Sequence, residues 1–316
     1  MMGKRLAVVC GDGVGDLLLM MIACQEYKKA GYEVTIFSGH FASFGRWFEG
    51  FSSSPHILLE DYREIFSSFD GVLLQHENSP RAKTLCSLRK DGHLPNLIVF
   101  YHQYQESKHG DVNAADFAFD YTKSAVENIS FAVQKMRNLS SPPKEIGLQI
   151  PSGLVHKKYP KRVVIHPTSS HTRKNWLPSK FISLAKKLRA KGFQPVFTVS
   201  KKERPDWVFL QEMGIDVPLL LSLDELAQKI YESGFFIGND SGPSHLASYM
   251  QIPLITIAPL HSGTYHWKPG WLEGPVIVPP SWTPNLKGLR LKQTNWQHFI
   301  TVKKVIKTFD KLISKC

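Results

Sequence analysis

The chain has 316 residues, of which 42% are hydrophobic and 21% are charged. This length suits one large or two medium domains and excludes a disordered chain or a small disulfide-stapled protein. The longest apolar run near the start, Leu17–Cys24, is too short to cross a bilayer, and the first residues lead into a strand rather than a signal peptide. We therefore expect a cytoplasmic protein.

Two compositional features concern cofactors and partners. The four cysteines stand far apart, without the spacing of a zinc site, which also argues against a disulfide framework. The chain has 39 Lys and Arg against 27 Asp and Glu, so its formal net charge is +12. This surplus suits an anionic partner such as nucleic acid, a nucleotide diphosphate or an acidic membrane surface, although simple solubility explains it equally well.

In the first half of the chain, short apolar β-branched runs alternate with helical patterns. The predicted elements are strand Leu6–Val9, helix Asp16–Ala30 with one apolar face, strands Val34–Phe37, Val72–Leu74 and Leu97–Phe100, and helix Ser124–Arg137. A Pro- and Ser-rich connection from Ser140 to Pro160 follows and reads as a link between domains.

The same alternation restarts after this connection. The predicted elements are strand Val163–His166, helix Ser179–Lys191, strand Pro195–Val199, helices Pro205–Met213 and Leu223–Ser233, strand Phe235–Gly238, helix Asp240–Tyr249 and strand Pro253–Ile257. Buried strands that alternate with helices predict parallel sheets. We expect an α/β protein with two Rossmann-like domains, 1–155 and 156–316, facing each other across a cleft that holds the ligand.

The last predicted helix, Thr301–Lys315, has an apolar stripe and several lysines on its other side. Packing of the stripe on the body of the protein, which includes packing back on the first domain, is favoured over a helix that lies on a membrane surface.

A glycine-rich turn, Gly11-Asp-Gly13-Val-Gly15-Asp16, follows the first strand. It is not a dinucleotide fingerprint, because Asp16 stands where the third glycine belongs and the second predicted strand is followed by Ser38-Gly39-His40 instead of an acidic residue. The turn places Asp16 at a helix N-terminus, where the helix dipole stabilises a carboxylate. This aspartate either accepts a proton in catalysis or only caps the helix, and the turn alone leaves both readings open.

Three segments of the second half suggest a phosphate site. A strand ends at His166 and leads into Thr168, Ser169, Ser170, Arg173 and Lys174, the hydroxyls and cations that a diphosphate requires. Asn239-Asp240-Ser241-Gly242-Pro243-Ser244-His245 leaves another strand and starts a helix, whose first amides can bind an anion. Trp267-Lys-Pro269-Gly270 follows the next strand. We assign no chemical role to His166 and His245, since such histidines are usually packed.

Together these segments resemble glycosyltransferase family 9, the heptosyltransferases of lipopolysaccharide core assembly. The resemblance rests on Gly15-Asp16, Lys174-x-Trp176, Asp240-Ser-Gly-Pro-Ser-His245 and Trp267-x-Pro269, and it is strongest in the second half of the chain. It implies a GT-B fold and inverting transfer of heptose from ADP-heptose to an acidic lipopolysaccharide inner-core acceptor (Kdo/heptose-lipid A).

The resemblance also implies roles for residues. Asp16 is the expected general base, and the first domain is expected to bind the acceptor. The second domain is expected to bind the donor through Thr168, Ser169, Lys174, Glu203, Leu221, Asp240, Ser241, Gly242, Pro243 and Ser244. Leu221, at the end of an expected strand, would line the adenine pocket, and Glu203 would meet the ribose.

The acceptor side is less well marked. Gly15, Arg46 and Arg81 are acceptor-binding candidates, with Lys83, Arg89 and Lys90 candidates by location only. Asp12, which departs from the family pattern, either raises the pKa of Asp16 or faces solvent.

The expected partners are the nucleotide-sugar donor, a lipid-linked acidic saccharide and the inner-membrane surface in peripheral contact, with no nucleic acid. We expect a monomer that needs no cofactor and has no metal site, with Mg²⁺ at most stimulatory. The alternatives are a glycosyltransferase of this fold with another nucleotide-sugar, a non-catalytic basic nucleic-acid-binding protein and a Rossmann oxidoreductase or GT-B-like epimerase.

Overall fold

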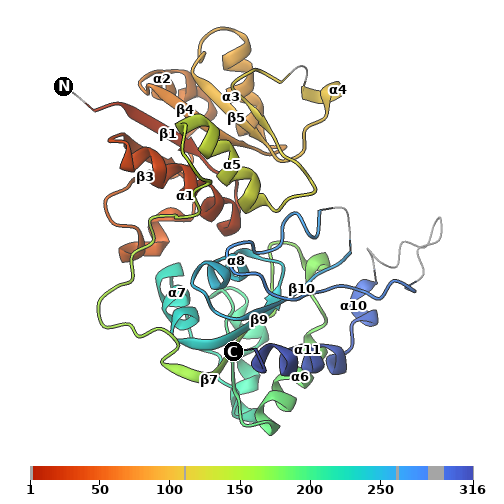
Figure 1. Ribbon diagram of the computed structural model, residues 1–316. Helices are drawn as coiled ribbons and strands as arrows, with labels where there is room; N and C mark the ends of the chain where they lie inside the picture. The colour runs from red at the N-terminus through yellow and green to blue at the C-terminus, as the bar shows by residue number, and fades with distance from the viewer. Residues whose placement is uncertain (1–2, 110–111, 261–262, 284–294, 316) are drawn as a thin grey trace. The chain divides into compact units, whose positions relative to one another are not determined.

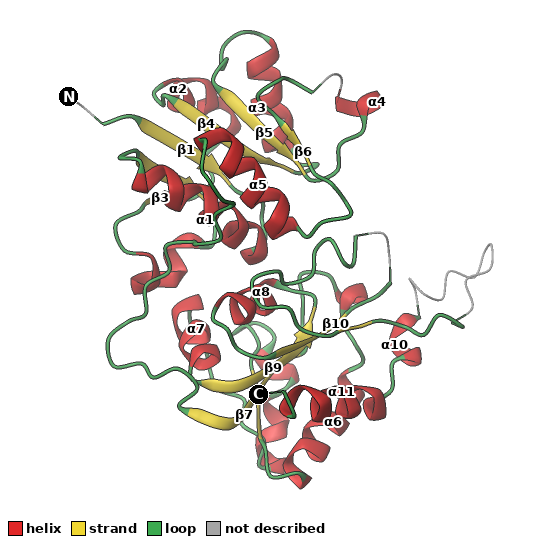
Figure 2. Cartoon of the chain, in the orientation of Figure 1, coloured by secondary structure: helices red, strands yellow, loops and turns green. Residues whose placement is uncertain are grey.

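The computed structural model describes residues 3–109, 112–260, 263–283 and 295–315 (Figure 1). The chain forms two compact units, Met1–Ile150 and Pro151–Cys316, each of which is an α/β domain (Figure 2). The division falls a few residues before the expected boundary after residue 155. The cleft expected between the units stays a prediction.

Unit 1 is built on a six-stranded parallel sheet with the order β3-β2-β1-β4-β5-β6. Its strands are β1 Arg5–Val9, β2 Glu33–Phe37, β3 Ser52–Ser54, β4 Gly71–His76, β5 Leu97–Tyr101 and β6 Phe117–Ala118. Its α-helices are α1 Val14–Lys29, α2 Tyr62–Ser67, α3 Pro80–Lys90, α4 Glu106–His109 and α5 Ala125–Arg137. The strand order reverses between β1 and β4, and in such sheets ligands bind at the carboxyl ends of the strands at this switch point.

Helices cover both faces of this sheet, so its central strands β1 and β4 are mainly apolar on both sides. Ala7 and Val9 of β1 pack with α2 and α3 in one hydrophobic cluster, while Leu6 and Val8, also buried, point to the opposite face because side chains alternate along a strand. Helix α1 packs beside α5 (Figure 2). Its residues Leu17–Cys24 are all buried, so the expected single apolar face is wrong: this helix is enclosed on all sides.

Unit 2 has a five-stranded parallel sheet with the order β11-β10-β9-β7-β8. Its strands are β7 Tyr159–His166, β8 Gln194–Phe197, β9 Ser233–Asn239, β10 Leu254–Ile257 and β11 Val276–Ile277. Its α-helices are α6 Pro178–Ala190, α7 Leu223–Tyr231, α8 Gly242–Tyr249, α10 Trp296–Phe299 and α11 Val302–Ile313. The order of the strands reverses between β7 and β9.

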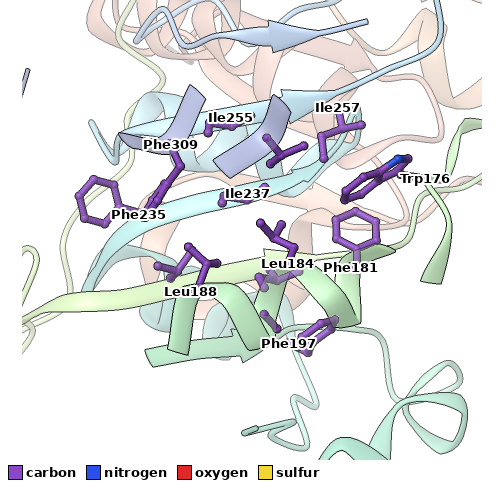
Figure 3. Close-up of a cluster of buried hydrophobic side chains, with 14 of the residues drawn as sticks. Trp176, Phe181, Leu184, Leu188, Phe197, Phe235, Ile237, Ile255, Ile257 and Phe309 are labelled. Carbon is purple, nitrogen blue, oxygen red and sulfur yellow. The ribbon is translucent and has the colours of Figure 1, made fainter. Parts of the chain in front are cut away.

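The core of unit 2 lies between its sheet and helices α6 and α11 (Figure 3). Phe309 of α11 packs edge-on against Phe235, with ring centres 5.1 Å apart, and α6 contributes Phe181, Leu184 and Leu188. The apolar stripe of the last helix therefore packs into the core of its own unit, which confirms packing over membrane binding for that stripe. Packing of this helix on the first domain stays a prediction.

Two predicted elements of unit 2 are wrong in kind. Residues 204–213 form two short 3-10 helices, Arg204–Asp206 and Val208–Met213, instead of one α-helix. Trp207 interrupts them with φ −124° and stacks its ring on Phe197, 5.3 Å between ring centres. Burial of this ring outweighs the local helical preference. Residues 217–221 form no strand, so Leu221 does not end one.

Candidate active site

The glycine turn of unit 1 holds Asp16 close to the backbone that precedes it. Asp16 lies in the first turn of α1, half-buried, and its Oδ2 accepts a hydrogen bond of 3.1 Å from the N–H of Gly13. A Cβ atom at Gly13 would lie 2.5 Å from this Oδ2, and one at Gly11 would lie 3.0 Å from the Asp16 Cγ. The two glycines therefore leave the space that the carboxylate occupies.

The other oxygen of Asp16 is held from the neighbouring strand. Gln75, near the carboxyl end of β4 and 2% exposed, donates from Nε2 to Asp16 Oδ1 at 3.1 Å and accepts from the N–H of Gly11 at 2.9 Å. Asp16 and Gln75 thus meet at the switch point between β1 and β4. Gln75 was not among the site residues predicted from the sequence, although a glutamine at the end of an apolar run is a signal that could have marked it.

Asp12 faces solvent, which is one of the two alternatives expected for it, and it also forms contacts of its own. Its side chain, 71% exposed, pairs with Arg81 at 3.0 Å and lies 3.5 Å from His56, while its carbonyl oxygen contacts His40 Nε2 at 2.8 Å. Arg81 also pairs with Glu77. Two carboxylates therefore neutralise Arg81, which weakens the case for Arg81 as an anion-binding acceptor residue.

The remaining acceptor candidates lie at different places in unit 1. Gly15 is in the first turn of α1, and Arg46 is exposed in the 3-10 helix Phe41–Phe48. Arg89 has a structural role, because it pairs with the buried Asp116 at 2.7 Å and so ties α3 to the segment before β6. Lys83 and Lys90 are exposed on α3. Acceptor binding by these residues stays a prediction.

In unit 2, Lys174 and Asp240 come together at the switch point between β7 and β9. Lys174 follows β7 and Asp240 follows β9, and their Nζ and Oδ2 atoms are 3.7 Å apart. Asp240 is 9% exposed and Lys174 is half-buried. The pair places a cation beside the start of α8, where helix amides also favour negative charge.

The buried side chain of Asn239 fixes the loop that carries Lys174. Its Oδ1 accepts from the N–H of Trp176 at 2.9 Å, and its Nδ2 donates to the Pro167 carbonyl at 2.6 Å. Trp176 is itself fully buried and donates from Nε1 to the carbonyl of Ile300. Asn239 thus holds both ends of the loop from residue 167 to residue 176 in place. The sequence motif did not indicate this role of Asn239.

Thr168 and Glu203 also meet at the carboxyl ends of the strands. The hydroxyl of Thr168 donates to Glu203 Oε2 at 3.3 Å, and this oxygen also accepts from Ser200 Oγ at 2.6 Å. Ser169 donates to Asn175 Oδ1 at 2.6 Å, within the same loop as Lys174. Leu221, by contrast, is 64% exposed in irregular chain, and its N–H donates to Glu225 at 2.7 Å. Its expected place at a strand end is wrong.

The start of α8 offers fewer amides than expected. Pro243 has no N–H, and the N–H of Ser244 already donates to the carbonyl of Ser241 at 3.0 Å. The amides of Ser241 and Gly242 are therefore the candidate anion donors among residues 241–244. Ser244 is fully buried and its hydroxyl donates to the same carbonyl, which gives it a structural part.

Both motif histidines are packed inside unit 2. Burial lowers the pKa of His166 to about 4, and its Nδ1 lies 3.4 Å from Thr198 Oγ1. Burial also lowers the pKa of His245, against the opposing influence of Asp240. Both rings are therefore packed, as the sequence predicted, and their lack of a chemical role stays a prediction.

Across residues 3–109, 112–260, 263–283 and 295–315, no group of three or more His, Cys, Asp or Glu side chains could hold a metal ion. Among the same residues no helix combines the length and the apolar character that crossing a bilayer demands. The expected independence from cofactors stays a prediction.

Part of the chain matches a known protein family. Residues 112–265 match glycosyltransferase family 9 (heptosyltransferase). A 148-residue segment, 43% of this chain, is 31% identical to lipopolysaccharide heptosyltransferase 3 of Escherichia coli and spans only 42% of that protein's length.

Solved structures show the same fold over nearly the whole chain. ADP-heptose lipopolysaccharide heptosyltransferase II of E. coli superposes with a TM-score of 0.70 and 15% identity, covering 99% of each chain. E. coli heptosyltransferase WaaC with ADP gives 0.67 and 15% identity, covering 98% of this chain and 100% of that one. The GT-B fold is thus confirmed, and the resemblance to glycosyltransferase family 9 that was expected from the sequence is confirmed over residues 112–265.

Proposed function

We propose that this protein is an inverting glycosyltransferase that moves heptose from ADP-heptose to an acidic saccharide of the lipopolysaccharide inner core. The observation that carries the proposal is the Lys174–Asp240 pair beside the first amides of α8, at the switch point of the second sheet. A cation and helix amides at this place suit the diphosphate of a nucleotide-sugar. The names of the similar proteins support heptose as the sugar.

In the proposed reaction, the acceptor hydroxyl attacks the anomeric carbon of the heptose in one displacement. The new carbon–oxygen bond forms on the face opposite to the departing ADP, while the bond to the diphosphate oxygen breaks. Asp16 takes the proton of the attacking hydroxyl, as a general base does. Lys174 and the amides of Ser241 and Gly242 stabilise the negative charge that develops on the diphosphate.

Donor binding tests the phosphate site. Lys174→Met is expected to weaken ADP binding about 10–100-fold, because a charge-assisted contact contributes roughly 1.5–3 kcal/mol. Isothermal titration with ADP measures the loss, and Lys186→Met, an exposed lysine on α6, controls for the change in net charge. Equal ADP affinities in the two variants would contradict the assignment of Lys174.

Ligand choice separates the proposed function from its alternatives. In a thermal-shift panel of ADP, UDP, NAD and RNA oligonucleotides, we expect ADP to raise the melting temperature most. Incubation with ADP-heptose and candidate core saccharides, followed by mass analysis, should then show a product heavier by one heptose. Stabilisation by UDP alone would indicate another nucleotide-sugar, and stabilisation by RNA alone would contradict the enzyme assignment.

The glycine turn provides a second test of Asp16. Gly13 has φ −90°, so alanine fits its backbone, but the added Cβ displaces the Asp16 carboxylate. Gly13→Ala is expected to lower turnover by roughly 10²-fold, the scale of a misplacement of about 1 Å, with the melting temperature nearly unchanged. Gly39→Ala, where nothing lies within 4 Å of the new Cβ, is the matched control. The same turnover in both variants would show that the carboxylate position is unimportant.

A further inference from the structure

Gln75 is a buried polar side chain whose amide oxygen and amide nitrogen both form hydrogen bonds. The N–H of Gly11 can only donate, so it fixes the Gln75 oxygen on its own side, and the Gln75 amino group must face Asp16. A side chain that is 2% exposed and bonded at both ends has one orientation. Gln75 is thus a rigid donor aimed at the carboxylate from the adjacent strand.

Both carboxylate oxygens of Asp16 accept hydrogen bonds. Gly13 donates to Oδ2 and Gln75 donates to Oδ1, both at 3.1 Å. Donors on two sides prevent the carboxylate from rotating about its Cβ–Cγ bond, and they favour its charged form over its protonated form. The backbone donor belongs to the same turn, whereas Gln75 ties the carboxylate to strand β4 of the sheet.

We propose that Gln75 is a positioning residue, which orients the Asp16 carboxylate and keeps it ionised for proton transfer. This inference rests on the proposed function, in which Asp16 is the general base. Gln75 contacts no reacting atom in this scheme, since it acts only through Asp16.

Other charged groups near the turn must be kept constant in a test. Asp12 and Glu77 both form ion pairs with Arg81, and His40 and His56 contact Asp12. Burial raises the pKa of the Cys10 thiol far above its ordinary value, and the negative charge of Asp16 adds to this effect. Substitution of Gln75 alone leaves all of these groups in place.

Two substitutions separate positioning from simple packing. Gln75→Glu keeps the size of the side chain and the acceptor for Gly11, but it puts a second carboxylate against Asp16. We expect the acid limb of the pH–rate profile to move up by about one pH unit or more, with activity recovered at higher pH. Gln75→Met removes both polar groups at similar volume, and we expect turnover on the pH plateau to fall roughly tenfold, with the acid limb moved to higher pH and ADP affinity unchanged.

The decisive measurement follows the Asp16 carboxyl directly. In protein labelled with carboxyl-¹³C aspartate, the resonance that Asp16→Asn removes reports its titration. We expect it to titrate at a higher pH in both Gln75 variants than in the unaltered protein, whereas Gln134→Glu, a glutamine on α5, leaves it unchanged. Titration at the same pH in Gln75→Met, judged folded by its melting temperature, would overturn the proposal even if Gln75→Glu does not fold.

The same experiment keeps the two proposals apart. If the resonance moves but Asp16→Asn retains full transfer activity, Gln75 controls the carboxylate and the proposed general base is wrong. If Asp16→Asn abolishes transfer and the resonance does not move, the general base stands and the positioning role of Gln75 fails.

Discussion

Asp16→Asn is expected to lower the turnover of heptose transfer by about 10²–10⁴-fold, the usual loss when a positioned general base is removed. Asparagine has the shape of aspartate and can still accept from Gly13, but it cannot take a proton from the acceptor hydroxyl. ADP affinity should change little, because the candidate donor residues all belong to unit 2 while Asp16 belongs to unit 1. Steady-state kinetics and ADP titration together test both statements.

The control for this substitution is Asp61→Asn, which changes the same charge at an exposed position before α2. Its turnover should match that of the unaltered protein. If Asp16→Asn also matches it, the proton acceptor is another group and the turn serves only to cap α1, the reading that the sequence left open.

Acidification from pH 6.5 to pH 4 is expected to destabilise unit 2 through His166. Burial lowers the pKa of this histidine from 6.5 to about 4, so the unfolded chain binds a proton in this window and the folded protein does not. The free energy of unfolding therefore falls as pH decreases, by about 2 kcal/mol at pH 5 and about 3 kcal/mol in full. Above pH 6.5 both states are neutral at this site and the contribution is complete.

Denaturant unfolding at pH 7.5 and pH 5, followed by tryptophan fluorescence, measures this effect, since six of the seven tryptophans lie in unit 2. In His166→Gln the loss of stability between the two pH values should be about 2 kcal/mol smaller than in the unaltered protein. His298→Gln replaces an exposed histidine and should keep the full pH dependence. An unchanged dependence in His166→Gln would show that His166 titrates near its ordinary pKa.

Sequence patterns were reliable where a segment depends mainly on its own residues. The apolar runs of β1, β7 and β9 predicted buried strands because parallel strands covered on both faces need apolar side chains throughout. Helix α3 was missed even though Ser79 and Pro80 form a recognisable helix start, with the Ser79 hydroxyl accepting from Ala82 at 3.2 Å. In residues 204–213 the sequence pattern predicted one α-helix, but the burial of Trp207 favours two short 3-10 helices instead.

The amino-acid sequence by itself determined the alternation of strands and helices, the glycine turn before Asp16 and the motifs of glycosyltransferase family 9. Each of these features depends on residues that are close together in the sequence. Only the tertiary structure decided which distant side chains meet, because strand order and register bring together residues as far apart as Asp16 and Gln75, or Lys174 and Asp240. For the same reason, only the tertiary structure showed that Arg81 forms ion pairs with Asp12 and Glu77. No local sequence pattern predicts these pairs.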